Sequence, residues 1–271
     1  MFKLYRFLSF IAIPLIFINI CWRIIQKKED KHRYKERFGK SSIHIPQKKI
    51  IWIHAASVGE ALSVLCLIER LLRDWPELCL LITTGTVTSA AIMKQRLPLG
   101  VIHQYAPVDH PRWIGRFLDY WRPELILWVE SEFWPNMLGE LASRKCPAVL
   151  INARISQSSF SGWSKFPATI KTLLSTFTLC LAQSDTDSGR LVKLGASNVA
   201  VSGNLKFAAN PLPAVEDDAA EFIGRIGNRA VWAAISTHEG EETVIAETDS
   251  ALRLKFANLL TFVAPRHPVR G

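Results

Sequence analysis

The sequence predicts an α/β protein, a doubly wound parallel sheet that is preceded by an N-terminal membrane anchor. Three observations lead to this fold class. From Lys48 onward, short apolar runs alternate with amphipathic runs, which is the pattern of strands joined by crossover helices. The 271 residues are 49% hydrophobic, enough for a sizeable core. The net charge of +9 is concentrated at the N-terminus, next to an apolar segment.

The apolar segment is FLSFIAIPLIFINICW, residues 7–22, which is uncharged and slightly shorter than a membrane span of about 18–20 residues. Seven basic residues against three acids follow it at 23–37, giving +4, and two basic residues before it add +2. This arrangement favours an anionic membrane surface over a nucleic acid. No small-residue cleavage pattern follows, so we expect residues 1–37 to form an uncleaved anchor with the remaining chain on the cytoplasmic side. An anchor that spans the bilayer and one that lies in a single leaflet are both compatible with this pattern.

The predicted elements of the first domain, residues 48–209, alternate regularly. Strands are expected at 50–54, 78–83, 125–129, 148–152, 179–183 and 199–202, and helices at 60–74, 88–97, 111–120, 135–143 and 185–194. Such an order predicts a Rossmann-like parallel sheet that is covered by helices on both faces.

The stretch NPLP, residues 210–213, is predicted to be a linker. A second unit, residues 215–271, follows it, with helices at 215–225 and 241–254 and strands at 230–235 and 259–264. Two strands are marginal for an independent domain, so we expect this second domain to be incomplete.

The stretch IWIHAASVGEALSVL, residues 51–65, is the first candidate for chemistry. We expect a buried strand, a turn of small residues that closes with Gly59, and a helix that begins at Glu60. This places the Glu60 carboxylate at the carboxyl end of a parallel strand, where open α/β sheets bind ligands. Glu60 is therefore a catalytic candidate. A structural role is also open, because Ser57 and Glu60 have the spacing of a helix capping box.

Two further candidates follow other predicted strands. Glu130 comes at the end of LILWVE, and Lys206 lies in the turn VSGNLKFA. A lysine in the ligand crevice can neutralise a phosphate or a developing negative charge. Taken singly, Glu130 fits a solvated loop acid before a proline-initiated helix, and Lys206 fits a surface charge. The clustering of all three candidates at strand ends is the stronger indication.

Other patterns limit the function classes. The motifs G-x-G-x-x-G and G-x-x-x-x-G-K-[ST] are absent, which argues against nicotinamide dehydrogenases and P-loop enzymes. The five cysteines include no close pair, which indicates a reducing compartment without a disulfide framework or a zinc site. His54 and His103 have no Cys or His at metal-ligand spacing, so each is expected to be a satisfied core or turn residue.

Seven motifs then occur in a recognisable order: HAASVGE (54–60), TTGT (83–86), WVESEFWPN (128–136), NARIS (152–156), GNLKF (203–207), STHEGEE (236–242) and PRHP (265–268). Together with the N-terminal anchor, they resemble the Kdo transferases, the 3-deoxy-D-manno-octulosonic acid transferases of lipopolysaccharide assembly. The usual HAVSVGE reads HAASVGE here, a small packing change at position 56.

The resemblance implies a GT-B glycosyltransferase with an acceptor-binding N-terminal domain and a donor-binding C-terminal domain. It implies transfer of Kdo from CMP-Kdo to a lipid A precursor (lipid IVA) at the bacterial inner membrane, with release of CMP and with no metal or other cofactor. Carried over by motif, Glu60 resembles the general base, Glu130 and Lys206 resemble residues that stabilise the transition state, and Pro265 and Arg266 match the start of the CMP-contacting segment. Because a helix N-terminus lowers a carboxylate's pKa, Glu60 is expected to rely on placement as much as on basicity.

The family continues well beyond PRHP, and three hypotheses follow. The first is a membrane-anchored Kdo transferase whose chain is given incompletely or has been truncated. The second is a non-catalytic remnant that binds the membrane or the acceptor only. The third is another anchored glycosyltransferase with a different sugar donor.

Overall fold

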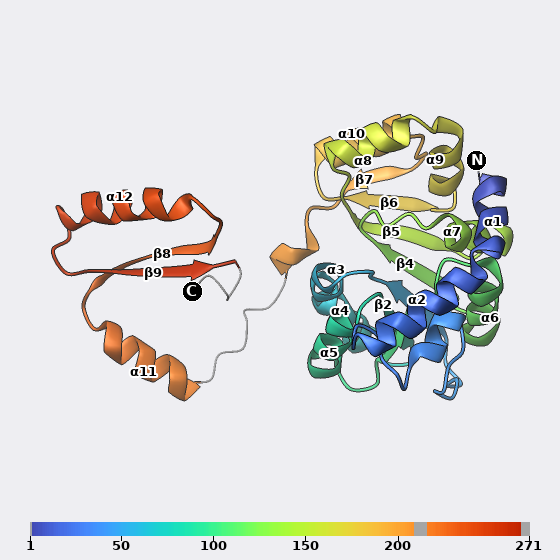
Figure 1. Ribbon diagram of the computed structural model, residues 1–271, viewed down its shortest axis with the longest axis horizontal. Coiled ribbons are helices and arrows are strands. Elements are labelled where there is room, and N and C mark those ends of the chain that lie inside the picture. Colours follow the sequence, from blue (N-terminus) through green and yellow to red (C-terminus); the bar gives the residue numbers. More distant parts are fainter. Residues whose placement is uncertain (1, 209–215, 267–271) are drawn as a thin grey trace. The chain divides into compact units, whose positions relative to one another are not determined.

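The computed structural model describes residues 2–208 and 216–266 and divides the chain into two compact units, residues 1–210 and 211–271 (Figure 1). The predicted linker at 210–213 and the last two residues of PRHP lie outside the described residues.

The first unit is built on a seven-stranded, entirely parallel sheet in the order β3-β2-β1-β4-β5-β6-β7. This confirms the predicted parallel α/β fold. The strands are β1 (Ile50–His54), β2 (Cys79–Thr84), β3 (Ile102–Tyr105), β4 (Leu125–Val129), β5 (Ala148–Ala153), β6 (Leu179–Ala182) and β7 (Val199–Val201). The order reverses direction between β1 and β4, and ligands of open α/β sheets bind outside the carboxyl ends of the strands at such a switch point.

Helices cover both faces of the sheet because its buried strands carry apolar side chains on both sides. Trp52 of β1 belongs to the core cluster of one face, to which α6 (Pro111–Trp121), α7 (Pro135–Ser143), α9 (Pro167–Leu174) and α10 (Asp185–Lys193) also contribute side chains. The neighbouring Ile53 points to the opposite face and packs with α3 (Val58–Ser63), α4 (Leu65–Asp74) and α5 (Val87–Arg96). Both side chains are fully buried.

Three local predictions were wrong. The predicted helix 60–74 is two helices, since α3 begins two residues earlier and the chain breaks at Val64 before α4. The edge strand β3 was missed, because its polar residues His103 and Gln104 find partners only in the folded protein, on Thr84 and Trp121. Helices α8 (Gln157–Ser164) and α9 (Pro167–Leu174) were also missed. The α8 sequence is rich in serine, which has a low helix propensity.

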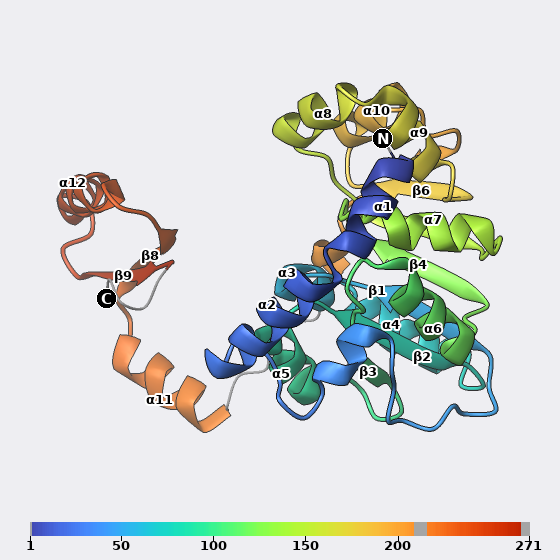
Figure 2. The same cartoon turned by 45° about the vertical axis from the view of Figure 1, so that its right-hand side comes forward.

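The apolar N-terminal segment forms two helices, α1 (Phe2–Ile11) and α2 (Ile13–Ile25), which lie along the first unit in both views (Figures 1 and 2). Within the described residues, neither helix alone meets the length and apolarity of a membrane span. The pair meets both together, but it is bent by 62°. One side of α2 packs on Phe38, the last residue of the 3-10 helix η1 (Tyr34–Phe38), and on Trp113 of α6.

The second unit contains α11 (Glu216–Ile226), β8 (Ala230–Thr237), α12 (Glu241–Arg253) and β9 (Leu259–Pro265). Its two strands pair in parallel around the crossover helix α12. All four elements predicted here are therefore present.

Candidate functional site

Glu60 lies in the first turn of α3, directly beyond the central strand β1. Ser57 caps the helix, since its hydroxyl accepts the Glu60 N–H at 3.3 Å and donates to Glu60 Oε1 at 2.9 Å. The second carboxylate oxygen, Oε2, accepts the backbone N–H of Ala56 at 2.8 Å. The capping interaction is thus confirmed, although the carboxylate bonds to the residue before the cap and not to the Ser57 N–H. The two bonds to Oε1 and Oε2 fix the carboxylate in one orientation.

Burial dominates the acidity of Glu60. The residue is 5% exposed, and burial raises its pKa to about 7, while the bonds from Ser57 and Ala56 lower it and the nearby Glu130 and Glu132 raise it further. The expectation that the helix terminus would lower this pKa was therefore wrong in net effect. A carboxylate with a pKa near neutrality is suited to general base catalysis.

The structure brings Glu130 and Lys206 together at the same edge of the sheet. Glu130 follows β4 with a left-handed φ of 57°, and its Oε1 lies 3.6 Å from Lys206 Nζ. Glu130 contributes to the raised pKa of Glu60, so both acids share one electrostatic environment. Lys206 lies in the 3-10 helix η2 (Leu205–Ala208), which contacts α3 and α4. The clustering predicted from strand ends is present.

Asn152 holds the segment that carries Lys206, a role that the sequence did not reveal. It is the penultimate residue of β5 and has a left-handed φ of 51°, and its Oδ1 accepts the Leu205 N–H at 3.0 Å. Asparagine tolerates this backbone conformation better than most residues. Its Nδ2 is buried without a hydrogen-bond partner in the described structure. The NARIS motif was visible in the sequence, but its contact with residue 205 depends on the fold.

The loop after β2 packs against the loop that carries Glu60. Gly85 donates its N–H to the Ala56 oxygen at 3.0 Å, and a side chain at this position would come within 2.6 Å of that oxygen. Only glycine permits such a close approach. The TTGT motif therefore has a packing role through Gly85, together with the capping of α5 by Thr86.

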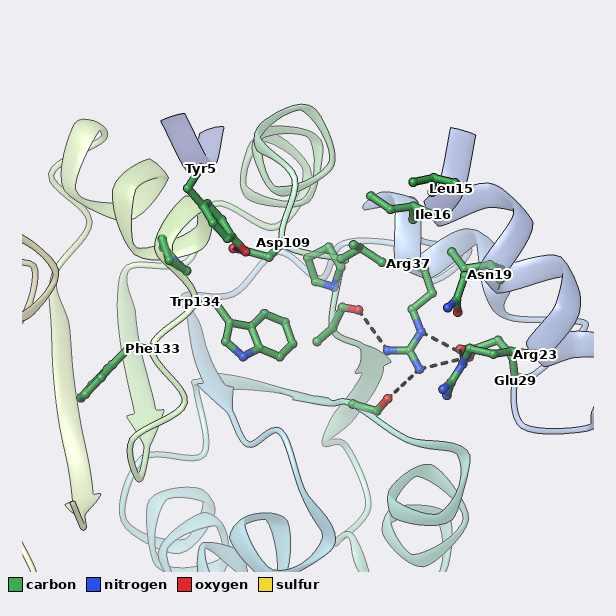
Figure 3. A pocket seen from close by; sticks show the side chains of 16 residues that line it. Tyr5, Leu15, Ile16, Asn19, Arg23, Glu29, Arg37, Asp109, Phe133 and Trp134 are labelled. Carbon is green, nitrogen blue, oxygen red and sulfur yellow. Dashed lines mark hydrogen bonds and ion pairs between the residues drawn. The ribbon is translucent and has the colours of Figure 1, made fainter. Parts of the chain in front are cut away.

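A cavity of about 710 Å³ separates α1 and α2 from the loops after β2, β3 and β4 (Figure 3). Apolar side chains line much of it, among them Leu15, Ile16, Phe133 and Trp134. Arg37 and Glu29 also line it, and dashed lines in Figure 3 mark the bonds of Arg37 to that carboxylate and to two backbone oxygens.

The histidines of the site region are core residues. His54 is fully buried between Trp128 and Trp134, with ring centroids at 4.3 and 5.0 Å. Its Nδ1 pairs with Thr83 Oγ1 at 3.0 Å, and burial lowers its pKa to about 3, which keeps it neutral. The core placement was predicted, but His54 Nε2 has no hydrogen-bond partner among the described atoms, so the ring is only half satisfied.

Pro265 and Arg266 belong to the second unit, at the end of β9, where the Arg266 N–H donates to the Thr237 oxygen at 3.1 Å. In residues 2–208 and 216–266, no three His, Cys, Asp or Glu side chains gather closely enough to hold a metal ion. The five cysteines are free.

Comparison with solved structures first defines the fold class of the chain. The crystal structure of UDP-GlcNAc 2-epimerase from Neisseria meningitidis bound to UDP-GlcNAc superposes with a TM-score of 0.56 at 14% identity, covering 80% of this chain and 65% of that chain. At this identity the likeness concerns the fold alone, which is GT-B-like.

The family is shown by sequence. The family described as 3-deoxy-D-manno-octulosonic-acid transferase (kdotransferase) matches residues 32–209. The 3-deoxy-D-manno-octulosonic acid transferase of Rickettsia bellii is 35% identical over 270 residues, which cover 100% of this chain and 64% of the relative. That of Haemophilus influenzae is 34% identical over 274 residues, with 98% and 63% covered. The chain belongs to the Kdo transferase family, and it spans about two thirds of the length of these relatives.

Proposed function

We propose that this protein transfers Kdo from CMP-Kdo to a lipid A precursor and releases CMP, with Glu60 as the general base. The observation that carries the proposal is the Glu60 carboxylate, which is fixed by two hydrogen bonds and raised in pKa to about 7. It lies at the switch point of a GT-B-like sheet in a chain of the Kdo transferase family. Glu60 takes the proton of the acceptor hydroxyl as that oxygen bonds to the sugar and the bond to the CMP phosphate breaks.

In this proposal Lys206 and Glu130 stabilise the transition state. The Lys206 ammonium neutralises the charge that develops on the departing phosphate, and Glu130, 3.6 Å away, holds the ammonium in place. Pro265 and Arg266 of the second unit contact the CMP of the donor. This assignment is supported by the sequence motif PRHP, which begins at Pro265.

We further propose that α1 and α2 lie in the cytoplasmic leaflet of the inner membrane, with the catalytic unit facing the cytoplasm. Side chains 51% to 78% exposed form an apolar stripe at helical spacing, which we name the outer stripe: Leu4, Leu8, Ile11, Leu15, Ile18, Trp22 and Ile25. The opposite side of α2 packs on the protein. A helix pair with one face on its own domain and one exposed apolar face is suited to an interfacial position.

The basic residues at 23–37 also support this placement, but the lysines contribute to it and the paired arginines do not. Arg33 and Arg37 pair with the buried Glu36 and Glu29, so these cations face the protein. Four exposed lysines next to α2 have no ion pair among the described residues: Lys27, Lys28, Lys31 and Lys35. They supply the attraction to anionic lipids, about 1 kcal/mol each near the surface.

The experiment is transfer of Kdo from CMP-Kdo to lipid IVA by the full-length gene product that carries this sequence. Glu60→Gln is expected to lower kcat about 100-fold or more, because the base is removed while the shape is retained. The exposed Glu77→Gln is the matched control and is expected to leave turnover unchanged. Full activity of Glu60→Gln, or the absence of transfer by the unaltered protein, would reject the proposal.

A further inference from the structure

Arg37 is a buried cation outside the proposed catalytic group. It is 6% exposed, and its guanidinium uses four donor contacts: Glu29 Oε1 at 3.2 and 3.0 Å, the Ala106 oxygen at 3.2 Å, and the Gly85 oxygen at 2.8 Å. Its planar fork thereby ties η1 to the loops after β2 and β3 (Figure 3).

The contact with Gly85 leads to Glu60 in two steps. The Gly85 N–H donates to the Ala56 oxygen at 3.0 Å, with a backbone approach too close for any side chain at position 85. The Ala56 N–H in turn donates to Glu60 Oε2 at 2.8 Å. A continuous path of hydrogen bonds and rigid backbone therefore joins the guanidinium to the carboxylate.

Arg33 provides an internal comparison. It also pairs with a buried glutamate, Glu36, and it also lies over the Tyr105 ring, at 4.8 Å against 4.5 Å for Arg37. Arg33 instead donates to the His103 oxygen at 2.8 Å and lies 3.2 Å from His103 Nδ1, both on the edge strand β3. The two arginines share their chemistry and differ in what they hold.

We propose that Arg37 is a positioning residue for Glu60, which acts through the backbone of Gly85 and Ala56 and with Glu29 as its counterion. The inference rests on the proposed role of Glu60 as the base. A buried ion pair contributes little net stability, so the geometry that it imposes is the more important consequence of this pair. Without the hydrogen bonds of the Arg37 guanidinium, the backbone of Gly85 and Ala56 is no longer held in place. The Ala56 N–H is then no longer a fixed partner for Glu60 Oε2.

The test compares Arg37→Lys with Arg33→Lys in the full-length gene product. Lysine keeps the positive charge but cannot make the fork of contacts. We expect Arg37→Lys to lower kcat about tenfold with KM changed less than about twofold, because a base acts only in the transition state. Arg33→Lys is expected to leave both values unchanged.

A second readout does not depend on catalysis. Residue-resolved amide hydrogen exchange is measured by NMR in detergent micelles for both variants. We expect the Ala56 and Gly85 amides to exchange about tenfold faster in Arg37→Lys, with the Leu127 and Leu150 amides of the central strands unchanged as a control for global unfolding.

The outcomes separate the two proposals. Unchanged exchange at Ala56 and Gly85 in Arg37→Lys, or the same acceleration in Arg33→Lys, overturns the positioning role. If these amides respond but Glu60→Gln remains fully active, the coupling stands and the assignment of the base fails.

Discussion

The Glu60 carboxylate takes part in the capping interaction at the start of α3, where Ser57 is the cap, and it is also the proposed base. The bonds from Ser57 and Ala56 lower its pKa, as a helix N-terminus does, but burial outweighs them, with Glu130 and Glu132 adding in the same direction. A capping role and a catalytic role are therefore compatible at one position. The sequence presented them as alternatives because spacing does not reveal burial.

The first prediction concerns the pH dependence of turnover. Since the base must be deprotonated and its pKa lies at about 7, kcat/KM is expected to be level above pH 8 and to fall about tenfold per pH unit well below pH 7. Steady-state assays from pH 5 to 9 measure this. An acid limb centred near 4.5, the ordinary value for glutamate, would show that burial does not control the base.

The second prediction concerns stability. The pKa of Glu60 rises from 4.5 to about 7 on folding, so its contribution to stability is fully present below pH 4.5 and is lost as the pH rises through 7, about 3 kcal/mol in all. Glu60→Gln carries no such titration. Urea unfolding at pH 5 and pH 8 is expected to show a smaller loss of stability for Glu60→Gln than for the unaltered protein. An equal loss in both would contradict the raised pKa.

At the scale of elements, the site depends on how η2 is held against the end of β5. The Asn152 side chain provides this contact through the Leu205 N–H, and its left-handed backbone is a second, separate requirement.

These two requirements can be separated by substitution. Asn152→Gly keeps the backbone conformation and removes the hydrogen bond, whereas Asn152→Ala loses both. We expect both variants to lower kcat, because Lys206 is no longer fixed beside Glu130. Thermal or urea unfolding is expected to show Asn152→Ala less stable than Asn152→Gly by about 1 kcal/mol. Unchanged kcat in both variants would remove Asn152 from the support of the site.

The outer stripe of α1 and α2 gives a prediction for membrane binding. Ile18→Ser combined with Trp22→Ser removes two exposed apolar side chains without touching the face that packs on the protein. Flotation with anionic vesicles is expected to show at least about tenfold weaker binding, since each buried side chain contributes about 1.5–3 kcal/mol. Val192→Ser on α10, 56% exposed in the unaltered protein, is the control. Equal binding by all three proteins would argue against the interfacial position.

At the scale of the whole molecule, the sequence predicted what depends on local pattern. The bounds of β1 and α7 agree with prediction to the residue, because an apolar run and a proline at the first helical turn define them. The strand β3 was missed because its polar side chains are satisfied only by tertiary partners. Arg37 looked like one more charge in a basic run, since its contacts with Gly85 and Ala106 lie 48 and 69 residues away.

The strand order also has a consequence for how the chain folds during synthesis. The central strand β1 pairs with β2, which soon follows it, and with β4, which begins at Leu125. The apolar helices α1 and α2 thus leave the ribosome long before the sheet that they pack on can close, and Lys206 emerges later still. At about 5–20 residues per second, roughly 10–40 s separate the first helix from the completed site. In the proposed interfacial placement, the nascent chain meets the lipid surface first and acquires its charged centre last.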